Sequence, residues 1–279
     1  ILAFRVWKDI IADSSFFKAS RTPFVIGVSG DSGSGKDTFS QSIVDLFGTE
    51  TSNCVHGDDY HLWDRGRPAW QVLTHLNPLA NDLGRLCQDV LALKQGKKIR
   101  ASHYNHETGI ISKPQTLRPH DLIIVSGLHT FSIPTLSDAC DLRIFLNMDE
   151  GLRRHLKVRR DMEARGYSYA QVIKNIERRV ADAEKFIKPQ QKQADLIFSL
   201  EPVEKTLGGN PLMKEIPRLS LKVESANSDR MRELYRSLIA FCGLHINLEV
   251  AEEEGNFEMI VEGEVYAEDI AEVVQIICP

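Results

Sequence analysis

Residues 30–38 constrain this chain more than any other segment, because they combine closely spaced glycines with one lysine. They fit the pattern G-x-x-x-x-G-K and read Gly30, Asp31, Ser32, Gly33, Ser34, Gly35, Lys36, Asp37, Thr38. The apolar run Phe24–Val28 precedes them, and apolar residues at helical spacing follow over Thr38–Phe47. A strand, a glycine-rich turn and a helix in this order are the context of a phosphate-binding loop.

Such a loop binds phosphate because backbone N–H groups and the positive end of a helix converge on the anion, while glycines allow close approach of the main chain. Lys36 would add its charge at the β- and γ-phosphates. We therefore expect all nine residues of 30–38 to bind ATP. Asp37 is an irregularity, because a Ser or Thr hydroxyl normally holds Mg²⁺ at this position. A Gly/Ser-rich turn without a ligand is the alternative interpretation.

Composition narrows the class of protein and of ligand. The chain has 279 residues, of which 42% are hydrophobic and 26% charged, and its formal net charge is −5. That balance gives no general attraction to nucleic acid or to an anionic membrane, so we expect neither as a partner. No apolar run is long enough to span a membrane and no signal peptide is recognised, which favours a cytoplasmic protein. A homo-oligomer stays open, as does a longer parent chain, since the sequence starts at Ile1.

Cysteine usage indicates neither a disulfide framework nor a zinc site. The five cysteines are scattered and odd in number, and no two of them form a C-x-x-C pair. We expect them to be reduced and mostly structural.

The order of apolar runs predicts the fold. Short β-rich runs at 53–56, 122–126, 142–147 and 196–200 alternate with helical segments such as 82–95 and 149–165. This alternation predicts an α/β protein of the P-loop NTPase type, with a mainly parallel sheet and helices on both faces. We divide the chain into an N-terminal packing helix within 1–22, a P-loop domain over 23–205 and a small C-terminal α+β appendage over 215–279.

A polar segment after the second expected strand carries two adjacent carboxylates, Asp58 and Asp59. Because side chains alternate across a strand, only one of them is expected to face a pocket at the strand end. We take Asp58 as the general base that a kinase needs to accept the proton of the attacked hydroxyl. His61 and Arg65 would bind an anionic group on the acceptor. A hydrogen-bonded polar turn is the alternative explanation.

Two further polar segments are weaker candidates. Ser126 ends an apolar strand at the place where nucleotide-binding folds usually carry an acidic residue that organises Mg²⁺. The side chains of Tyr104 and His106 suit sugar hydroxyls. A serine that only caps a turn explains Ser126 equally well on its own, and for residues 104–109 alone a plain turn is the better explanation.

A basic helix supplies the remaining charge. Arg153, Lys157 and Arg160 lie on one helical face, a density of positive charge that suits the phosphate in a transition state. Asp161 would orient the arginines or assist with the metal. A solvated basic face is the ordinary alternative, but expected proximity to the phosphate loop favours catalysis.

With these motifs together, the chain resembles the phosphoribulokinase and uridine kinase family over about Phe24–Leu200, and the phosphoribulokinase branch more closely. The motifs are D-D-Y-H-x-x-D-R at 58–65, Y-N-H-x-T-G at 104–109, G-L-H at 127–129, K-x-x-R-D-x-x-x-R-G at 157–166 and F-I-x-P-Q at 186–190. The resemblance implies an ATP- and Mg²⁺-dependent kinase acting on ribulose 5-phosphate.

The resemblance also implies roles for single residues. Asp58, Lys36, Lys157, Arg160 and Asp161 would be catalytic. Substrate binding would involve His61, Arg65, Tyr104, His106, His129 and Arg165. Uridine kinases carry D-S-F-Y where this chain has Asp58–His61, so the His61–Arg65 spacing favours a phosphorylated acceptor over a nucleoside. Uridine or another nucleoside is the alternative substrate.

Two departures from the family pattern lie where Mg²⁺ is expected. Asp37 replaces the loop Ser or Thr, and Ser126 replaces a strand-end Glu. We hypothesise an exchange in which the carboxylate moves to the loop and the hydroxyl to the strand. Asp37 and Ser126 would then be the metal ligands, so that one carboxylate and one hydroxyl remain near Mg²⁺. The opposing hypothesis is a catalytically impaired nucleotide-binding regulatory module.

Overall fold

A computed structural model describes residues 22–203, 218–225, 232, 236, 246–253 and 256–263. The N-terminal packing helix expected within 1–22 and the linker that the glycines and prolines of 206–217 predict lie outside the described residues. Within them, no helix is long and apolar enough to cross a membrane.

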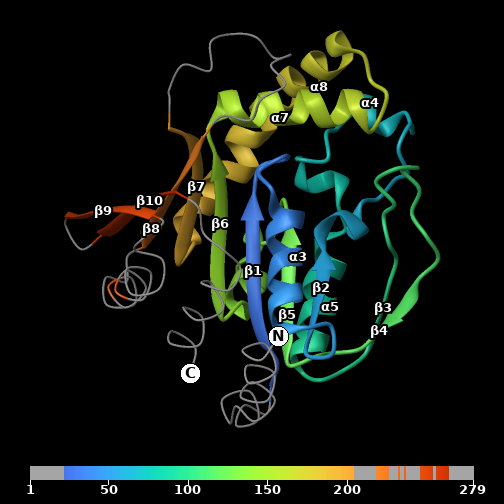
Figure 1. Cartoon of the computed structure of the whole chain (residues 1–279). Helices are drawn as coiled ribbons and strands as arrows, with labels where there is room; N and C mark the ends of the chain where they lie inside the picture. The colour runs from blue at the N-terminus through green and yellow to red at the C-terminus, as the bar shows by residue number, and fades with distance from the viewer. Residues whose placement is uncertain are drawn as a thin grey trace.

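The centre of the molecule is an eight-stranded sheet in the order β2-β5-β1-β6-β7-β8-β10-β9 (Figure 1). Its first five strands run parallel: β2 (Ser52–His56), β5 (Leu122–Gly127), β1 (Phe24–Gly30), β6 (Leu142–Met148) and β7 (Leu196–Pro202). Three antiparallel strands follow: β8 (Leu219–Ser225), β10 (Asn256–Gly263) and β9 (Ile246–Glu253). The predicted mainly parallel α/β sheet is confirmed, and the C-terminal strands extend this same sheet, because β8 pairs with β7.

Helices cover both faces of the parallel strands. The main ones are α3 (Lys36–Phe47), α5 (Leu83–Lys94), α6 (Pro134–Ala139), α7 (Glu150–Glu163) and α8 (Tyr169–Asp182). Shorter elements are η1 (Gly57–Tyr60), α4 (Ala69–Val72), η2 (Pro78–Ala80), η3 (Ala183–Ile187), η4 (Lys188–Gln193) and the hairpin β3 (Ile99–Ala101) with β4 (Gln115–Leu117).

The alternation of side chains along the strands produces two separate cores. Val25 and Ile123 face a cluster that includes α5 and α6, whereas the next residues, Ile26 and Ile124, face a cluster that includes α3. Strands that are apolar on both sides can be covered only by helices on both sides, which explains the continuous apolar runs in the sequence.

Helices α7 and α8 lie beyond the carboxyl ends of the parallel strands (Figure 1). Each begins at a side-chain cap: Asp149 accepts a hydrogen bond from the Leu152 N–H, and Ser168 forms a capping box with Gln171. The pair packs through a small cluster around Val158 and Ile176. Their position brings the basic residues of the sequence to the end of the sheet where ligands bind in such folds.

Candidate active site

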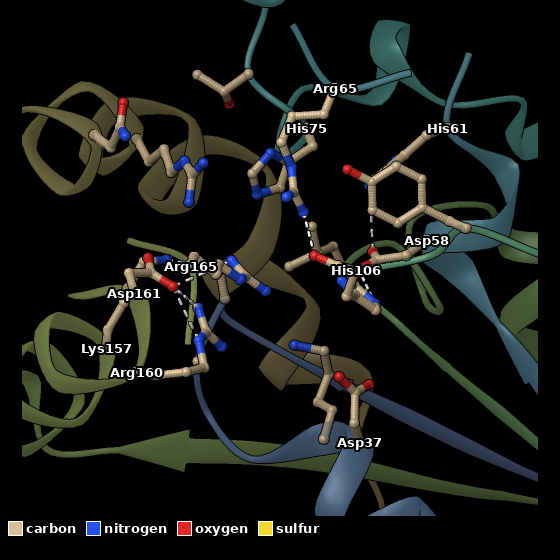
Figure 2. Close-up of a pocket in the computed structure, with 18 of the residues that line it drawn as sticks. Asp37, Asp58, His61, Arg65, His75, His106, Lys157, Arg160, Asp161 and Arg165 are labelled. Atoms are coloured by element: carbon tan, nitrogen blue, oxygen red, sulfur yellow. Dashed lines mark hydrogen bonds and ion pairs between the residues drawn. The ribbon is translucent and has the colours of Figure 1, made fainter. Parts of the chain in front are cut away.

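A cavity of about 680 Å³ lies at the carboxyl end of the parallel strands. Figure 2 shows Asp58, His61 and His106 on one side of it and Lys157, Arg160, Asp161 and Arg165 on the other. Most of the site residues expected from the sequence line it: Ser32, Gly33, Gly35, Lys36, Asp37, Thr38, Asp58, His61, Arg65, Tyr104, His106, Ser126, Lys157, Arg160, Asp161 and Arg165. The fold thus brings together segments that lie far apart in the sequence.

The glycine-rich loop has the geometry that its composition predicts. Gly30 ends β1 with a φ of +153°, and a Cβ there would lie 2.3 Å from the carbonyl oxygen of Leu146 on the neighbouring strand. Only glycine fits this turn without moving β6. Helix α3 then begins at Lys36, so its first N–H groups point toward the cavity end of the sheet. The loop therefore offers an anion site.

Lys36 lies among acidic groups. Its Nζ donates a hydrogen bond to the carbonyl oxygen of Asp31 at 2.8 Å. Burial lowers the pKa of the Lys36 ammonium, and the charges of Asp58 and Asp37 oppose that shift. The Lys36 ammonium thus lies within electrostatic reach of the Asp58 and Asp37 carboxylates.

Helix α7 holds the loop from the side. The Arg153 Nη1 donates to the Ser32 carbonyl oxygen at 3.0 Å and lies 3.2 Å from an Asp31 carboxylate oxygen. Lys157 Nζ donates to the Ser32 Oγ at 2.8 Å. Arg153 lies beside the phosphate loop, as its place on the helix face predicts, but it does not line the cavity. Its guanidinium is occupied by the loop backbone and by Glu150.

The next turn of α7 carries the exposed end of this basic surface. Asp161 is buried, and its carboxylate pairs with Arg160 at 2.9 Å and with Arg165 at 3.1 Å. Burial and the nearby arginines, Arg179 first, hold the pKa of Lys157 well below its ordinary value. Asp161 thus orients two arginines, as the sequence predicts. Together with Lys157, these arginines form the cationic wall of the cavity on the side of α7.

Asp58 lies between two imidazoles. His61 Nε2 is 3.6 Å from one of its carboxylate oxygens and His106 Nε2 is 3.5 Å from the other. Burial alone would raise the pKa of this carboxyl, but the charges of His61, His106 and Lys36 act together in the opposite direction and lower it. The pKa is therefore held below its usual value, and the group is a carboxylate near neutral pH.

Asp59 points elsewhere. Its Oδ1 accepts a hydrogen bond from the Tyr104 N–H at 2.6 Å and lies 3.2 Å from His103 Nδ1. Burial raises the pKa of this carboxyl. Asp59 does not line the cavity, so the choice of Asp58 over its neighbour as the pocket-facing carboxylate agrees with the structure.

Arg65 holds the loop that carries His106. Its guanidinium donates to the carbonyl oxygens of His106 at 2.5 Å and Glu107 at 3.1 Å. The chain passes so close that a Cβ on Gly109 would lie 2.2 Å from the Arg65 Cβ. Arg65 lines the cavity as expected, yet it also positions one of the two imidazoles beside Asp58.

His129 does not line the cavity, contrary to its expected place among the substrate-binding residues. Its imidazole is 3% exposed and interacts with the carbonyl oxygen of His75 and the Ser132 hydroxyl. Burial lowers its pKa to about 4. Gly30, Asp31 and Ser34 also lie outside the cavity lining, where they shape the loop.

Sequence reasoning missed several residues that also line the cavity, among them His56, Trp70, Thr74, His75, Asn175, Arg178 and Arg179. The adjacent arginines of α8 are the strongest omission, since Arg179 is buried enough that its pKa falls to about 10. Their only signal was a pair of arginines in an amphipathic helix, which resembles a solvated face.

Ser126 and Asp37 both line the cavity. The Ser126 hydroxyl is buried and has no hydrogen-bond partner among the described residues. A buried hydroxyl without a partner suits a ligand oxygen or a cation. The described residues contain no group of three or more His, Cys, Asp or Glu side chains that could hold a metal by themselves. Mg²⁺ is commonly bound by one or two protein ligands together with phosphates and water.

The parallel sheet, the glycine-rich loop and the helix that starts at Lys36 define a P-loop protein of the α/β class. Residues 25–207 match the Phosphoribulokinase / Uridine kinase family, and the chain belongs to that family.

The relatives come from both branches. A phosphoribulokinase of Synechocystis is 36% identical over 179 residues, which is 64% of this chain and 54% of that protein. A uridine kinase of Alkaliphilus metalliredigens is 30% identical over 181 residues, which is 63% of this chain and 86% of that protein. The chain spans about half the length of the phosphoribulokinases of Synechocystis, Mesembryanthemum crystallinum and Spinacia oleracea. The solved phosphoribulokinase of Rhodobacter spheroides has the same fold, with a TM-score of 0.69 at 21% identity over 92% of this chain and 95% of that one.

Proposed function

We propose that this chain is an ATP-dependent kinase that transfers the γ-phosphate to a hydroxyl of a small sugar phosphate, with ribulose 5-phosphate as the leading acceptor. One observation carries the proposal: the carboxylate of Asp58 shares a single cavity with the phosphate loop and the cationic wall of α7. A kinase needs these two sides, a base for the hydroxyl and positive charge for the phosphates, to face each other.

On the nucleotide side, the N–H groups at the start of α3 would bind the ATP phosphates and Lys36 would neutralise the β- and γ-phosphate charge. Arg160 and Arg165, oriented by Asp161, are placed to stabilise the charge that develops on the transferred group. Lys157 bonds the loop in this structure, and its ammonium can exchange that serine for a phosphate oxygen.

On the acceptor side, Asp58 would accept the proton of the attacking hydroxyl. Its lowered pKa keeps it ionised, and the imidazoles of His61 and His106 flank the carboxylate. Those rings, with Tyr104 and Arg65, would bind the hydroxyls and the phosphate of a sugar phosphate. A nucleoside is the second candidate, because the chain also matches uridine kinases over most of their length.

Mg²⁺ is part of the proposal, and Asp37 and Ser126 are the residues that would hold it. The unpartnered Ser126 hydroxyl and the Asp37 carboxylate both face the cavity and are hard oxygen ligands. When bound, the ion would neutralise phosphate charge and orient the β- and γ-phosphates.

The exchange between loop and strand has its own test. Asp37→Ser and Ser126→Glu each remove or displace a ligand, and the double variant restores the usual arrangement. ATP affinity would be measured with and without Mg²⁺, together with turnover. Recovery of the Mg²⁺-dependent part of the affinity in the double variant supports the exchange, whereas strictly additive losses contradict it.

The acceptor is tested by measuring ADP release with ATP and Mg²⁺ against ribulose 5-phosphate, other pentose phosphates, uridine, cytidine and glycerate. We expect turnover with ribulose 5-phosphate, and a loss of about 10²- to 10⁴-fold in kcat for Asp58→Asn. Turnover with nucleosides alone would make uridine kinase chemistry the better assignment. ATP binding without turnover on any acceptor would favour the nucleotide-binding regulatory module.

A further inference from the structure

Asn81 is joined to His61 through both backbone and side chain. The two residues form an antiparallel bridge. It is flanked by hydrogen bonds from the Leu62 N–H to the Ala80 carbonyl and from the Asp82 N–H to the Tyr60 carbonyl. The Asn81 Oδ1 lies 2.7 Å from His61 Nδ1. Asn81 itself does not line the cavity, so it can act only through the histidine.

Chemistry fixes which way the Asn81 amide points. Its Nδ2 donates to two backbone carbonyl oxygens, those of His75 and Asn77, each at 3.0 Å. Carbonyl oxygens only accept hydrogen bonds, so a flipped amide would place an oxygen against two other oxygens. The oxygen of the amide must therefore face His61.

The proton on His61 follows from this orientation. An amide oxygen accepts a hydrogen bond, so His61 Nδ1 must carry hydrogen to donate at 2.7 Å. The other ring nitrogen, Nε2, is the one that faces the Asp58 carboxylate at 3.6 Å. Any gain or loss of a proton by this ring then takes place at Nε2, directly beside Asp58.

We propose that Asn81 is a positioning residue, which holds His61 as the Nδ1-protonated tautomer. His61 Nε2 is then the ring nitrogen that interacts with Asp58 and with the acceptor hydroxyl. The assignment of the His61 tautomer depends only on the hydrogen bonds of Asn81. Its effect on turnover rests on the proposed kinase function. With a proton on Nε2 the ring attracts the Asp58 carboxylate. Without one, the nitrogen accepts a hydrogen bond from the hydroxyl that Asp58 is to deprotonate.

Other groups around the ring cannot replace this contact. His61 packs edge-on against Trp70 and Tyr104 and lies beside His75. Other ionisable groups that interact electrostatically with His61 are Asp58, His106 and His129. Burial keeps His75 and His129 uncharged at neutral pH, since it lowers the pKa of both. Among these groups, the Asn81 amide is the hydrogen-bond partner of Nδ1.

The tautomer is measured first, on the whole chain without substrate, from the ¹⁵N shifts of the His61 ring. The wild-type protein should show Nδ1–H at high pH, with Nε2 as the nitrogen that titrates. Asn81→Leu should shift the population toward Nε2–H. Asn81→Asp loses the two hydrogen bonds that Nδ2 donates but retains the acceptor for His61, so it should keep Nδ1–H. Asn77→Ala disturbs the same turn without touching His61 and should leave the tautomer unchanged.

Turnover is measured second. Asn81→Leu should lower kcat/KM for the acceptor by about ten- to a hundredfold with little change in the affinity for ATP, and Asn81→Asp should recover part of the loss. An Nε2–H tautomer in the wild-type protein overturns the proposal even if Asn81→Leu does not fold. An unchanged tautomer in Asn81→Leu, or a shift of the same size in Asn77→Ala, also overturns it. Absence of turnover with every acceptor contradicts the kinase function instead and leaves the tautomer result standing.

Discussion

Ser126→Ala separates a metal-binding role of this hydroxyl from a structural one. Ser126 is 3% exposed and its Oγ has no hydrogen-bond partner among the described residues. Because this hydroxyl has no partner, its removal breaks no hydrogen bond within the described residues. It also removes a buried unpaired polar group, whose burial costs about 1–3 kcal/mol. The free energy of unfolding of the ligand-free protein should stay the same or rise by up to about 1 kcal/mol. If the hydroxyl contacts Mg²⁺ in the complex, Mg·ATP binding should instead weaken by about ten- to a hundredfold.

Urea denaturation measures both effects in one series: without ligand, with ATP plus EDTA, and with saturating Mg·ATP, whose stabilisation reports affinity by mass action. Ser137→Ala is the matched control, because this hydroxyl is also buried and unpartnered but lies on α6, outside the cavity lining. The control should leave the Mg·ATP stabilisation unchanged. Two results would refute the reasoning. One is a fall of more than about 1 kcal/mol in the free energy of unfolding of ligand-free Ser126→Ala. The other is a stabilisation of Ser126→Ala by Mg·ATP that equals that of the wild-type protein.

Three further changes test other parts of the site and fold. Between its ordinary pKa of 6.5 and about 4, folded His129 stays uncharged while the unfolded chain binds a proton. The free energy of unfolding should therefore fall by about 3 kcal/mol as the pH drops through that range, and urea titrations of His129→Gln should lack this part of the slope. Gln190→Leu removes the partner of buried groups at Ser29 and Phe131 and should cost at least about 3 kcal/mol by the same assay. Gly109→Ala should raise the acceptor KM with unchanged ATP affinity in steady-state kinetics, because its Cβ collides with Arg65.

Local signals made the phosphate loop and the parallel strands predictable. The loop needs glycine at Gly30 because a neighbouring strand passes within 2.3 Å of the place of a Cβ, and that requirement is visible in the sequence. The strands are apolar on both faces, which only a covered parallel sheet explains. The expectation that only one of two adjacent carboxylates faces the cavity agrees with the structure, but strand alternation is not its cause, because Asp58 and Asp59 lie in the short helix η1.

Residues that reach the cavity from distant segments were not predictable in this way. His75 and Arg179 line it because a loop and α8 fold over the sheet edge, and no spacing in their own segments records that approach. His129 shows the reverse error. It follows a strand end closely in sequence, yet its ring turns toward the His75 carbonyl and is buried there. Proximity in sequence to a site does not determine which way a side chain points.

Helix α7 shows most clearly what periodicity can and cannot predict. The spacing of Arg153, Lys157 and Arg160 places all three on one face, and the structure agrees on the face but separates their roles by depth. Arg153 and Lys157 are buried and both bond Ser32 of the phosphate loop, whereas the Arg160 side chain is 41% exposed and pairs with Asp161. A phosphate that draws Lys157 from Ser32 would release one contact between loop and helix, while Arg153 keeps its contacts with Ser32 and Asp31. The loop can then adjust to the nucleotide while Arg153 keeps it attached to α7. This difference in role follows from how deeply each side chain is buried, and the charge of the three residues alone would not predict it.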